Sequence, residues 1–558
     1  MNSNKYPSMK KLTVTKKGVK LLLDKLNPKK AIGPDQVPTF LLKEHSDIFC
    51  SILQVIFQKS LDTGVVPSDW KKANVVAIYK KDSKNDPANY RPVSLTCISC
   101  KVLEHIVFTN VMDHLDRHAI LKHFQHGFRK QHSCETQLVN TMEELCRGLK
   151  DEQQIDALIL DFSKAFDVVG HRRLMGKLDH YGVRGDTHRW IQQWLTGRSQ
   201  RVVVEGESSD AVPVRSGVPQ GTVLGPLMFI IYINDISDGT DSSIRLFADD
   251  ALLYRVVTNT RDCSKLQYDL HTMCRWGADW QMDFNPKKCH VLSITNKKSP
   301  IFYPYTLNGV QLSHVKNHPY LGVELDNKIS WKTHINQTTG KAQKTLNLLR
   351  RNLHNCSQKT KETAYKTMIR PTLEYASAAW DPYEQKQITQ LEAVQNRAAR
   401  FVKNEYRRQG VSVTGLKESL DWRSLQERRF ITRQTLFYKA HHGLAAVDIP
   451  PYIGRPPPPN PDDREKRTSH DIQYRAGHTR VDSYKYSFFP RTIQSWNILD
   501  ESVVTTLNQK KQPCADLFKK RLTNCFTQGS MYMVDPRGVQ DRPRLGSTRR
   551  AGPVGPVF

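Results

Sequence analysis

The 558-residue chain lacks any apolar run of the about 18 residues that a membrane-spanning helix needs, and its first residues contain no apolar signal core. Its eleven cysteines are odd in number and scattered from Cys50 to Cys525, which argues against a disulfide framework. The close pair Cys97 and Cys100 has no second pair or histidine at zinc spacing, so we interpret it as buried thiols. These absences exclude membrane and disulfide-rich secreted proteins, and we expect an intracellular location, nuclear and cytoplasmic.

Acidic residues are few relative to basic ones. The chain has 83 Lys and Arg against 55 Asp and Glu, a formal net charge of +28. This excess favours a nucleic-acid partner, because basic side chains that neutralise phosphates release counterions, although basic surfaces also serve membranes and acidic proteins. The length suggests three or four domains of about 150 residues each.

Two adjacent acids, Asp249 and Asp250, separate the mainly apolar runs 244–248 and 251–257, which both have strand length. This pattern predicts a β-hairpin with two carboxylates at its tip. Enclosed carboxylates cost roughly several kcal/mol per ion unless cations neutralise them, and Mg²⁺ is typically held by one or two carboxylates plus substrate phosphates. An Asp-Asp turn at the surface is the alternative, since Asp is a common turn residue.

A further acid lies upstream, where the buried-strand pattern 157–160 ends at Asp161. Two strands that each end in an acid can share one pair of metals. Metals roughly 3.5–4 Å apart can clamp both the attacking and the leaving oxygens of an in-line phosphoryl displacement. The three acids therefore indicate a site suited to nucleotidyl transfer.

A loop rich in glycine, residues 215–227, lies between these acids and precedes the apolar run 228–233. Its glycines and Pro219 let the backbone pass close to a ligand, and we expect the helix that they open to present free N–H groups to an anion. Further along, Asn308-Gly309 predicts a two-residue hairpin turn, because these residues tolerate positive φ angles.

The order of these motifs resembles the reverse transcriptase of a non-LTR (LINE-type) retrotransposon of the jockey-like animal group. The residues that carry the resemblance are 160–167, 217–227 and 247–250, and the resemblance extends from about Ala31 to about Phe518. Residues 125–130 match another family stretch near the template path. One departure follows Asp167, where this chain has Val168-Val169-Gly170 and the family usually has a small residue or Thr followed by Pro or Asp.

The resemblance implies an RNA-directed DNA polymerase, a nucleotidyltransferase that takes an RNA template, a DNA primer and dNTPs. It implies an α+β fold of the right-hand polymerase type, with fingers and an antiparallel palm sheet in residues 31–325 and a helical thumb and connection in 326–445. Residues 1–30 would be an N-terminal extension, 446–534 a Pro-rich linker with a mainly helical C-terminal region, and 535–558 a disordered basic tail.

The resemblance also implies the roles of single residues. Asp161, Asp249 and Asp250 would be catalytic, and Asp161, Phe162, Asp249 and Asp250 would hold Mg²⁺, with Mn²⁺ as a substitute. The implied nucleotide-binding residues are Lys80, Arg91, Phe162, Phe166, Gln220 and Gly221, and the implied primer grip is Tyr320, Leu321 and Gly322. Lys287 is a candidate general acid.

Phe166 would lie under the incoming sugar, where its ring would clash with a ribose 2′-OH and so select deoxynucleotides. A phenylalanine of the core is the alternative interpretation. An RNA-directed RNA polymerase would use the same metals, but Phe166 argues against it.

The family's full protein usually carries a nicking endonuclease ahead of the polymerase, whereas here about thirty residues precede the first motif. We therefore expect the endonuclease on a missing segment or another chain. A second hypothesis is a decayed or domesticated copy that binds RNA without catalysis, suggested by the missing endonuclease and by residues 168–170. The three acids are all present, which favours the enzyme.

Overall fold

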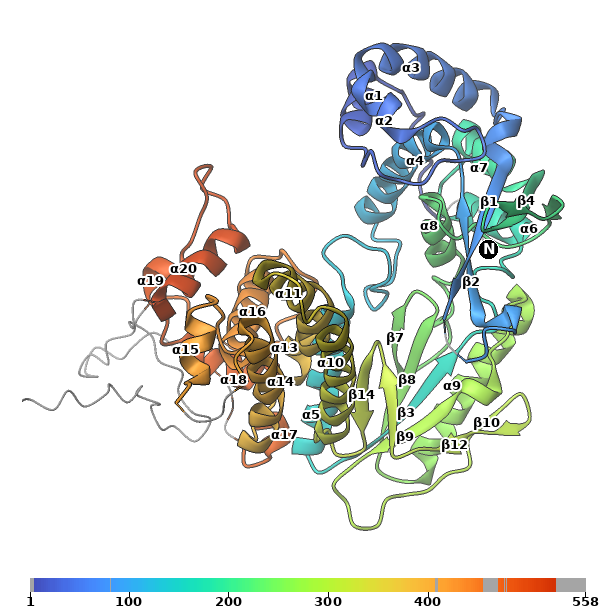
Figure 1. Ribbon diagram of the computed structural model, residues 1–558. Coiled ribbons are helices and arrows are strands. Elements are labelled where there is room, and N and C mark those ends of the chain that lie inside the picture. Colours follow the sequence, from blue (N-terminus) through green and yellow to red (C-terminus); the bar gives the residue numbers. More distant parts are fainter. Residues whose placement is uncertain are drawn as a thin grey trace, which may run out of the picture. The chain divides into compact units, whose positions relative to one another are not determined.

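The structure is a computed structural model that describes residues 5–80, 82–406, 410–454, 470–475, 477 and 479–527 (Figure 1). Its chain forms two compact units. Unit 1 comprises residues 1–133, 155–293 and 299–315, and unit 2 comprises residues 134–154, 294–298 and 316–558. The proline run 456–459 and the predicted basic tail lie outside the described residues.

A first sheet in unit 1 has the strands β1 (Lys72–Tyr79), β2 (Tyr90–Leu95), β4 (Arg198–Val204), β5 (Glu207–Ser208) and β6 (Val212–Val214). β1 and β2 form an antiparallel hairpin whose last pair is Tyr79 with Tyr90. Lys80 follows the first of these strands and Arg91 lies in the second. This hairpin therefore carries both of the cations that the sequence assigns to nucleotide binding.

Besides α9 (Thr260–Trp280), the described part of unit 1 has the helices α1 (Lys16–Asp24), α2 (Thr39–Glu44), α3 (Ser46–Thr63), α4 (Ile98–Arg117), α6 (His171–His180), α7 (Gly185–Leu195) and α8 (Leu224–Tyr232). α8 follows the glycine-rich loop, and all of its residues except Pro226 are buried. A helix that is apolar all round belongs in a core. Its first residue, Leu224, thus fixes the end of the loop in the protein interior.

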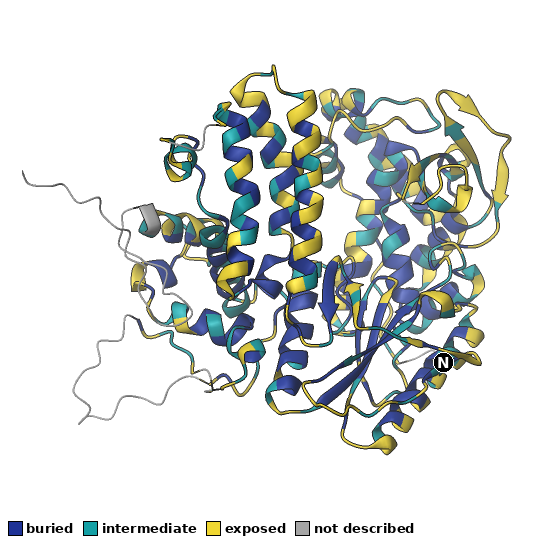
Figure 2. Ribbon diagram, turned by 60° about the horizontal axis from the view of Figure 1, so that its bottom comes forward, coloured by how far each residue is buried: buried dark blue, intermediate teal, exposed yellow. Residues whose placement is uncertain are grey.

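The second sheet of unit 1 has the strand order β12 (Ser313–His314), β9 (His290–Ile294), β3 (Gln154–Asp161), β8 (Asp250–Val257) and β7 (Ser243–Phe247). β3 is central and buried along its length until Asp161. The strands at the lower centre of Figure 2 are mostly dark blue, the colour of buried residues. Helix α9 (Thr260–Trp280) contacts β8 (Figure 1). The sheet is not purely antiparallel as predicted, because β12 pairs with β9 in parallel.

A small hairpin, β10 (Thr306–Leu307) and β11 (Val310–Gln311), confirms the predicted Asn-Gly turn. Asn308 has φ of 50° and Gly309 has φ of 78°. Both central residues thus adopt the positive φ that a type I′ turn requires.

Unit 2 is mainly helical. Its strands are β13 (Asn317–Tyr320) and β14 (Val323–Asp326). Its longer helices are α5 (Cys134–Lys150), α10 (Lys332–Asn352), α14 (Gln385–Lys403), α16 (Leu425–His441), α18 (Phe488–Trp496) and α20 (Ala515–Thr527), and its shorter ones are α11 (Gln358–Ala364), α12 (Arg370–Glu374), α13 (Ser377–Trp380), α15 (Val413–Glu418), α17 (Asp482–Lys485) and α19 (Glu501–Val504).

Asp381, which follows α13, is the centre of a buried ion cluster in this unit. Its carboxylate accepts a hydrogen bond from Arg429 Nε at 2.8 Å and another from Arg433, both on α16. Arg491 of α18 lies 3.3 Å from the same carboxylate. One acid therefore links three segments of the helical unit.

The mixed helix and sheet content agrees with the predicted α+β class, while the division into fingers, palm and thumb stays a prediction. Within the described part of the chain, every helix is too short or too polar to cross a bilayer.

Candidate active site

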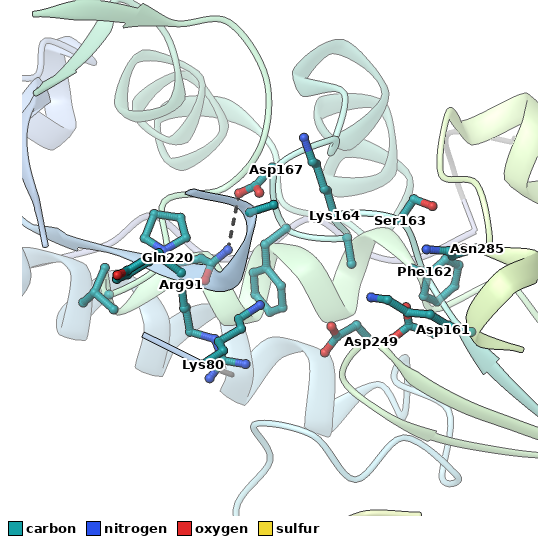
Figure 3. Close-up of a pocket in the computed structure, with 18 of the residues that line it drawn as sticks. Lys80, Arg91, Asp161, Phe162, Ser163, Lys164, Asp167, Gln220, Asp249 and Asn285 are labelled. Atoms are coloured by element: carbon teal, nitrogen blue, oxygen red, sulfur yellow. Dashed lines mark hydrogen bonds and ion pairs between the residues drawn. The ribbon is translucent and has the colours of Figure 1, made fainter. Parts of the chain in front are cut away.

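Three acidic residues lie at one end of the second sheet of unit 1. β3 ends at Asp161, and β8, its neighbour in the sheet, begins at Asp250. The last residue pair between β7 and β8 is Phe247 with Asp250, so Ala248 and Asp249 form the two-residue tip of the hairpin. The predicted hairpin with acids at its tip is confirmed, and Figure 3 shows Asp249 beside Asp161.

The electrostatics of these acids differ from those of ordinary surface carboxylates. Asp249 and Asp250 touch solvent, but the protein around them removes much of their hydration. This desolvation raises the pKa of both, and repulsion from Asp249 and Asp161 helps to raise the pKa of Asp250 to about 6. Arg91 and Lys80 act on Asp249 in the opposite sense and limit the rise of its pKa.

The same acids suit divalent cations. Asp161 Oδ2 accepts no hydrogen bond, and its charge is balanced by Lys288 Nζ at 3.1 Å. Among the described residues, no three His, Cys, Asp or Glu side chains converge as a complete ligand set. Mg²⁺ usually takes further ligands from water and substrate phosphates, so a site here would need only one or two of these carboxylates from the protein.

A cavity of about 1040 Å³ opens beside the acids. All six of the residues predicted to bind nucleotide line it: Lys80, Arg91, Phe162, Phe166, Gln220 and Gly221. Figure 3 shows Lys80 and Arg91 in the same cavity as Asp161 and Asp249. The predicted primer-grip residues belong to unit 2, where Tyr320 ends β13 and Leu321 and Gly322 form the turn to β14.

Phe166 is half-buried and fixed on two sides. Its ring stacks on Phe229 of α8 with centroids 4.3 Å apart and an angle of 16°, and the edge of Phe128 lies 6.2 Å away. Phe162, which also lines the cavity, is buried, and its ring stacks on Phe284 with centroids 4.4 Å apart. Phe166 therefore combines both interpretations of the sequence, since it packs on the core and lines the cavity.

The glycine-rich loop lies against the β1–β2 hairpin. Gln220 O accepts the Ser94 N–H at 2.7 Å, and Gln220 Nε2 donates to Asp167 Oδ1 at 3.3 Å. Gly221 has φ of 105°, and a Cβ there would lie 2.7 Å from Ser94 O. Only glycine fits this position without a backbone shift.

The expected free N–H groups at the start of α8 are not free, so that prediction is wrong. Glu104 of α4 is fully buried, and its Oε2 accepts the N–H groups of Val223 at 2.7 Å and Leu224 at 3.2 Å. This protein carboxylate occupies the place where a ligand anion was expected. The signal in the sequence was a lone acid within an apolar helix.

The structure also adds lining residues that the sequence analysis missed: Phe128, Lys164, Asp167, Asn285 and Lys288. Lys288 lines the cavity and pairs with Asp161, whereas the neighbouring Lys287, the candidate general acid, does not line it. The sequence signal for Lys288 was its place in the same Asn-Pro-Lys-Lys turn.

Comparison with known proteins shows what the segment that holds this cavity resembles. Residues 78–325 match the family model of the reverse transcriptase (RNA-dependent DNA polymerase). This segment is therefore similar to reverse transcriptases. The matched residues include Asp161, Asp249 and Asp250 and every predicted nucleotide-binding residue.

Curated relatives extend this similarity. The chain is 28% identical over 450 residues to a probable RNA-directed DNA polymerase from transposon BS of Drosophila melanogaster, an alignment that covers 76% of this chain and 48% of the relative. It is 28% identical over 404 residues to the RNA-directed DNA polymerase from mobile element jockey of the same organism, an alignment that covers 70% of this chain and 44% of the relative. The predicted jockey-like reverse transcriptase resemblance is thus confirmed, and the chain spans about half the length of the curated relatives it matches.

Proposed function

We propose that the chain is an RNA-directed DNA polymerase of a non-LTR retrotransposon, which extends the 3′-OH of a DNA primer along an RNA template. The observation that supports this most directly is a single cavity lined by Asp161 and Asp249 of the sheet and by Lys80 and Arg91 of the β1–β2 hairpin. Carboxylates for cations and cations for phosphates are the two requirements of nucleotidyl transfer.

Asp161, Asp249 and Asp250, with Phe162, would hold two Mg²⁺ ions, for which Mn²⁺ is a substitute. Bound divalent cations would activate the primer 3′-OH and neutralise the departing pyrophosphate. The chain's own contribution is to hold the carboxylates together in spite of their repulsion; desolvation first, and then this repulsion, raise the pKa of Asp250.

Lys80 and Arg91 would bind the triphosphate of the incoming dNTP. Both are exposed in the cavity, and the Arg guanidinium suits phosphate oxygens because of its paired donors. Their place on one hairpin would let both reach the same triphosphate.

Phe166, Gln220 and Gly221 would form the wall against the sugar and base of the dNTP. The stack of Phe166 on Phe229 holds the ring in one orientation. A fixed ring discriminates against a 2′-OH better than a mobile one, because it cannot turn aside when a ribonucleotide enters.

Tyr320, Leu321 and Gly322 would position the primer end. Leu321 and Gly322 have positive φ, 47° and 79°, and Tyr375 Oη donates a hydrogen bond to Leu321 O at 3.0 Å. This tight turn is a rigid support for a strand end.

The test is incorporation of dTTP on a poly(rA)/oligo(dT) template–primer with Mg²⁺. We expect extension by the parent and none by Asp249→Asn, while the control Asp210→Asn, an exposed acid between β5 and β6, retains parent activity. A folded parent that binds the template–primer but does not extend it in Mg²⁺ or Mn²⁺ would support the RNA-binding alternative.

A further inference from the structure

The β7–β8 hairpin is held from outside by residues 124–127, which we call the tip bracket. Leu246 N–H donates to Phe124 O at 3.0 Å, and His126 N–H donates to Leu246 O at 2.9 Å. Gln125 pairs with Leu246 in parallel. The tip bracket thus extends the sheet beside β7, and its backbone pairing stops two residues short of Ala248.

The side chain of Gln125 continues this pairing. Its Oε1 accepts the N–H of Ala248 at 2.9 Å and the N–H of Gly127 at 2.7 Å. Because alternate N–H groups of a strand point to the same side, Ala248 presents its donor to the bracket as Leu246 does. The carboxamide takes the place of the next backbone acceptor, and only 2% of Gln125 is exposed.

The hairpin tip needs such support. Ala248 has φ of 54° and Asp249 does not share the positive φ, which is the pattern of a type II′ turn, where glycine is usual at the first position. A residue other than glycine keeps this conformation when its surroundings determine it. Gly127 packs closely here, since a Cβ on it would lie 2.3 Å from Ala248 N.

We propose that Gln125 is a positioning residue for Asp249 and Asp250. Its carboxamide fixes the N–H of Ala248 and thereby sets the direction in which the next two carboxylates point. This inference rests on the proposed polymerase function. Since a misplacement of about 1 Å can cost roughly 10²-fold in rate, loss of the carboxamide lowers kcat. The KM for dNTP, which depends on other walls of the cavity, changes little.

The test compares Gln125→Met with Gln267→Met. Methionine keeps the length of the side chain and removes the acceptor. Gln267 of α9 is a matched control, because it is 8% exposed and its Oε1 accepts the Thr306 N–H at 2.7 Å, away from the cavity lining. Both variants lose a buried acceptor for a backbone N–H, so a general loss of stability affects both.

Two quantities are measured: kcat and KM for dTTP, and hydrogen exchange of the substrate-free protein over residues 246–252. For Gln125→Met we expect kcat to fall about 30-fold, KM to stay within about threefold of the parent, and exchange at the tip to accelerate. For Gln267→Met we expect parent kcat and parent exchange at the tip. A Gln125→Met enzyme with the control's kcat, or with parent exchange at the tip, overturns the proposal.

Gln125→Glu serves as the conservative variant, because a carboxylate still accepts both N–H groups. We expect its tip exchange to match that of the parent, and faster exchange at the tip in this variant overturns the proposal even where Gln125→Met does not fold. Exchange is measured without substrate. An inactive parent would therefore count against the polymerase function, while the tip exchange would still decide the role of Gln125.

Discussion

Asp250 of unit 1 and Asp381 of unit 2 are both desolvated carboxylates, and their surroundings act on them in opposite directions. Asp250 lies beside Asp249 and Asp161, and its pKa rises to about 6. Burial also raises the pKa of Asp381, but Arg491, Arg433 and Arg429 outweigh it and lower that pKa overall. A carboxylate with complete protein partners stabilises a fold, whereas carboxylates that repel one another are suited to bind cations.

The largest expected effect comes from removing the charge of Asp250. Asp250→Asn should reduce dTTP incorporation by roughly 10⁴-fold, because several kcal/mol of charge stabilisation are lost. The free energy of unfolding in metal-free buffer should stay constant or increase, since one repelling charge is gone. Primer extension and urea denaturation measure the two quantities, and a less stable variant would mean that Asp250 resembles Asp381 after all.

Asp381→Asn should produce the opposite pattern. Its loss leaves Arg429 and Arg433 buried without a counter-charge, so we expect the free energy of unfolding of unit 2 to fall by about 3–5 kcal/mol. Asp471→Asn, at an exposed acid of the same unit, is the control and should change it little. Urea denaturation followed by tryptophan fluorescence measures both, and equal stability of the two variants would refute a structural role for Asp381.

A substitution at Phe166 tests whether this ring acts on the substrate in the cavity or only packs in the core. Phe166→Val removes most of the ring that lines the cavity, so we expect the preference for dNTP over rNTP to fall by at least about tenfold. Loss of the stack on Phe229 should cost about 1 kcal/mol of stability or somewhat more. The measurement is the ratio of kcat/KM for dTTP and UTP. A stability loss with an unchanged ratio would make Phe166 a core residue only.

The local features of this site could be predicted from the sequence. Strand periodicity and the paired acids predict that one strand ends at Asp161 and that another begins at Asp250. The dipeptide Asn308-Gly309 predicts the turn that it forms. Contacts between distant segments could not be predicted: Glu104 meets Val223 across 119 positions, and nothing in the periodicity of α4 indicates that partner. The choice of Lys288 over Lys287 depends on the backbone of one short turn, which propensities do not determine.

The parallel pairing of β12 with β9 was missed for a similar reason. Both strands are short, and period-2 alternation gives the face of a residue but not the direction of its neighbour. The role of Gln125 was also hidden. Its function depends on a backbone N–H of Ala248, which has no sequence signal of its own.

The smallest expected effect is the pH dependence of stability, and it sharpens the contrast between the two acids. An acid whose pKa is raised on folding binds protons more tightly in the native state, so the stability that it contributes is lost as pH rises from about 4 to about 6. For Asp381 the sign is reversed: a lowered pKa gives stability that is present above the unfolded value near 3.8 and lost as pH falls through the folded value.

Because Asp250 is exposed to solvent, its contribution should be only about 1 kcal/mol after screening. Urea denaturation of the metal-free parent and of Asp250→Asn at pH 4.5 and pH 7 measures it. Between pH 4.5 and pH 7, the free energy of unfolding of the parent should fall by about 1 kcal/mol more than that of Asp250→Asn. Addition of Mg²⁺ at pH 7 should restore this free energy in the parent and not in the variant. Equal pH profiles for the two proteins would mean that repulsion among the three carboxylates does not lower the free energy of unfolding of unit 1. A bound cation would then not be needed to relieve that repulsion.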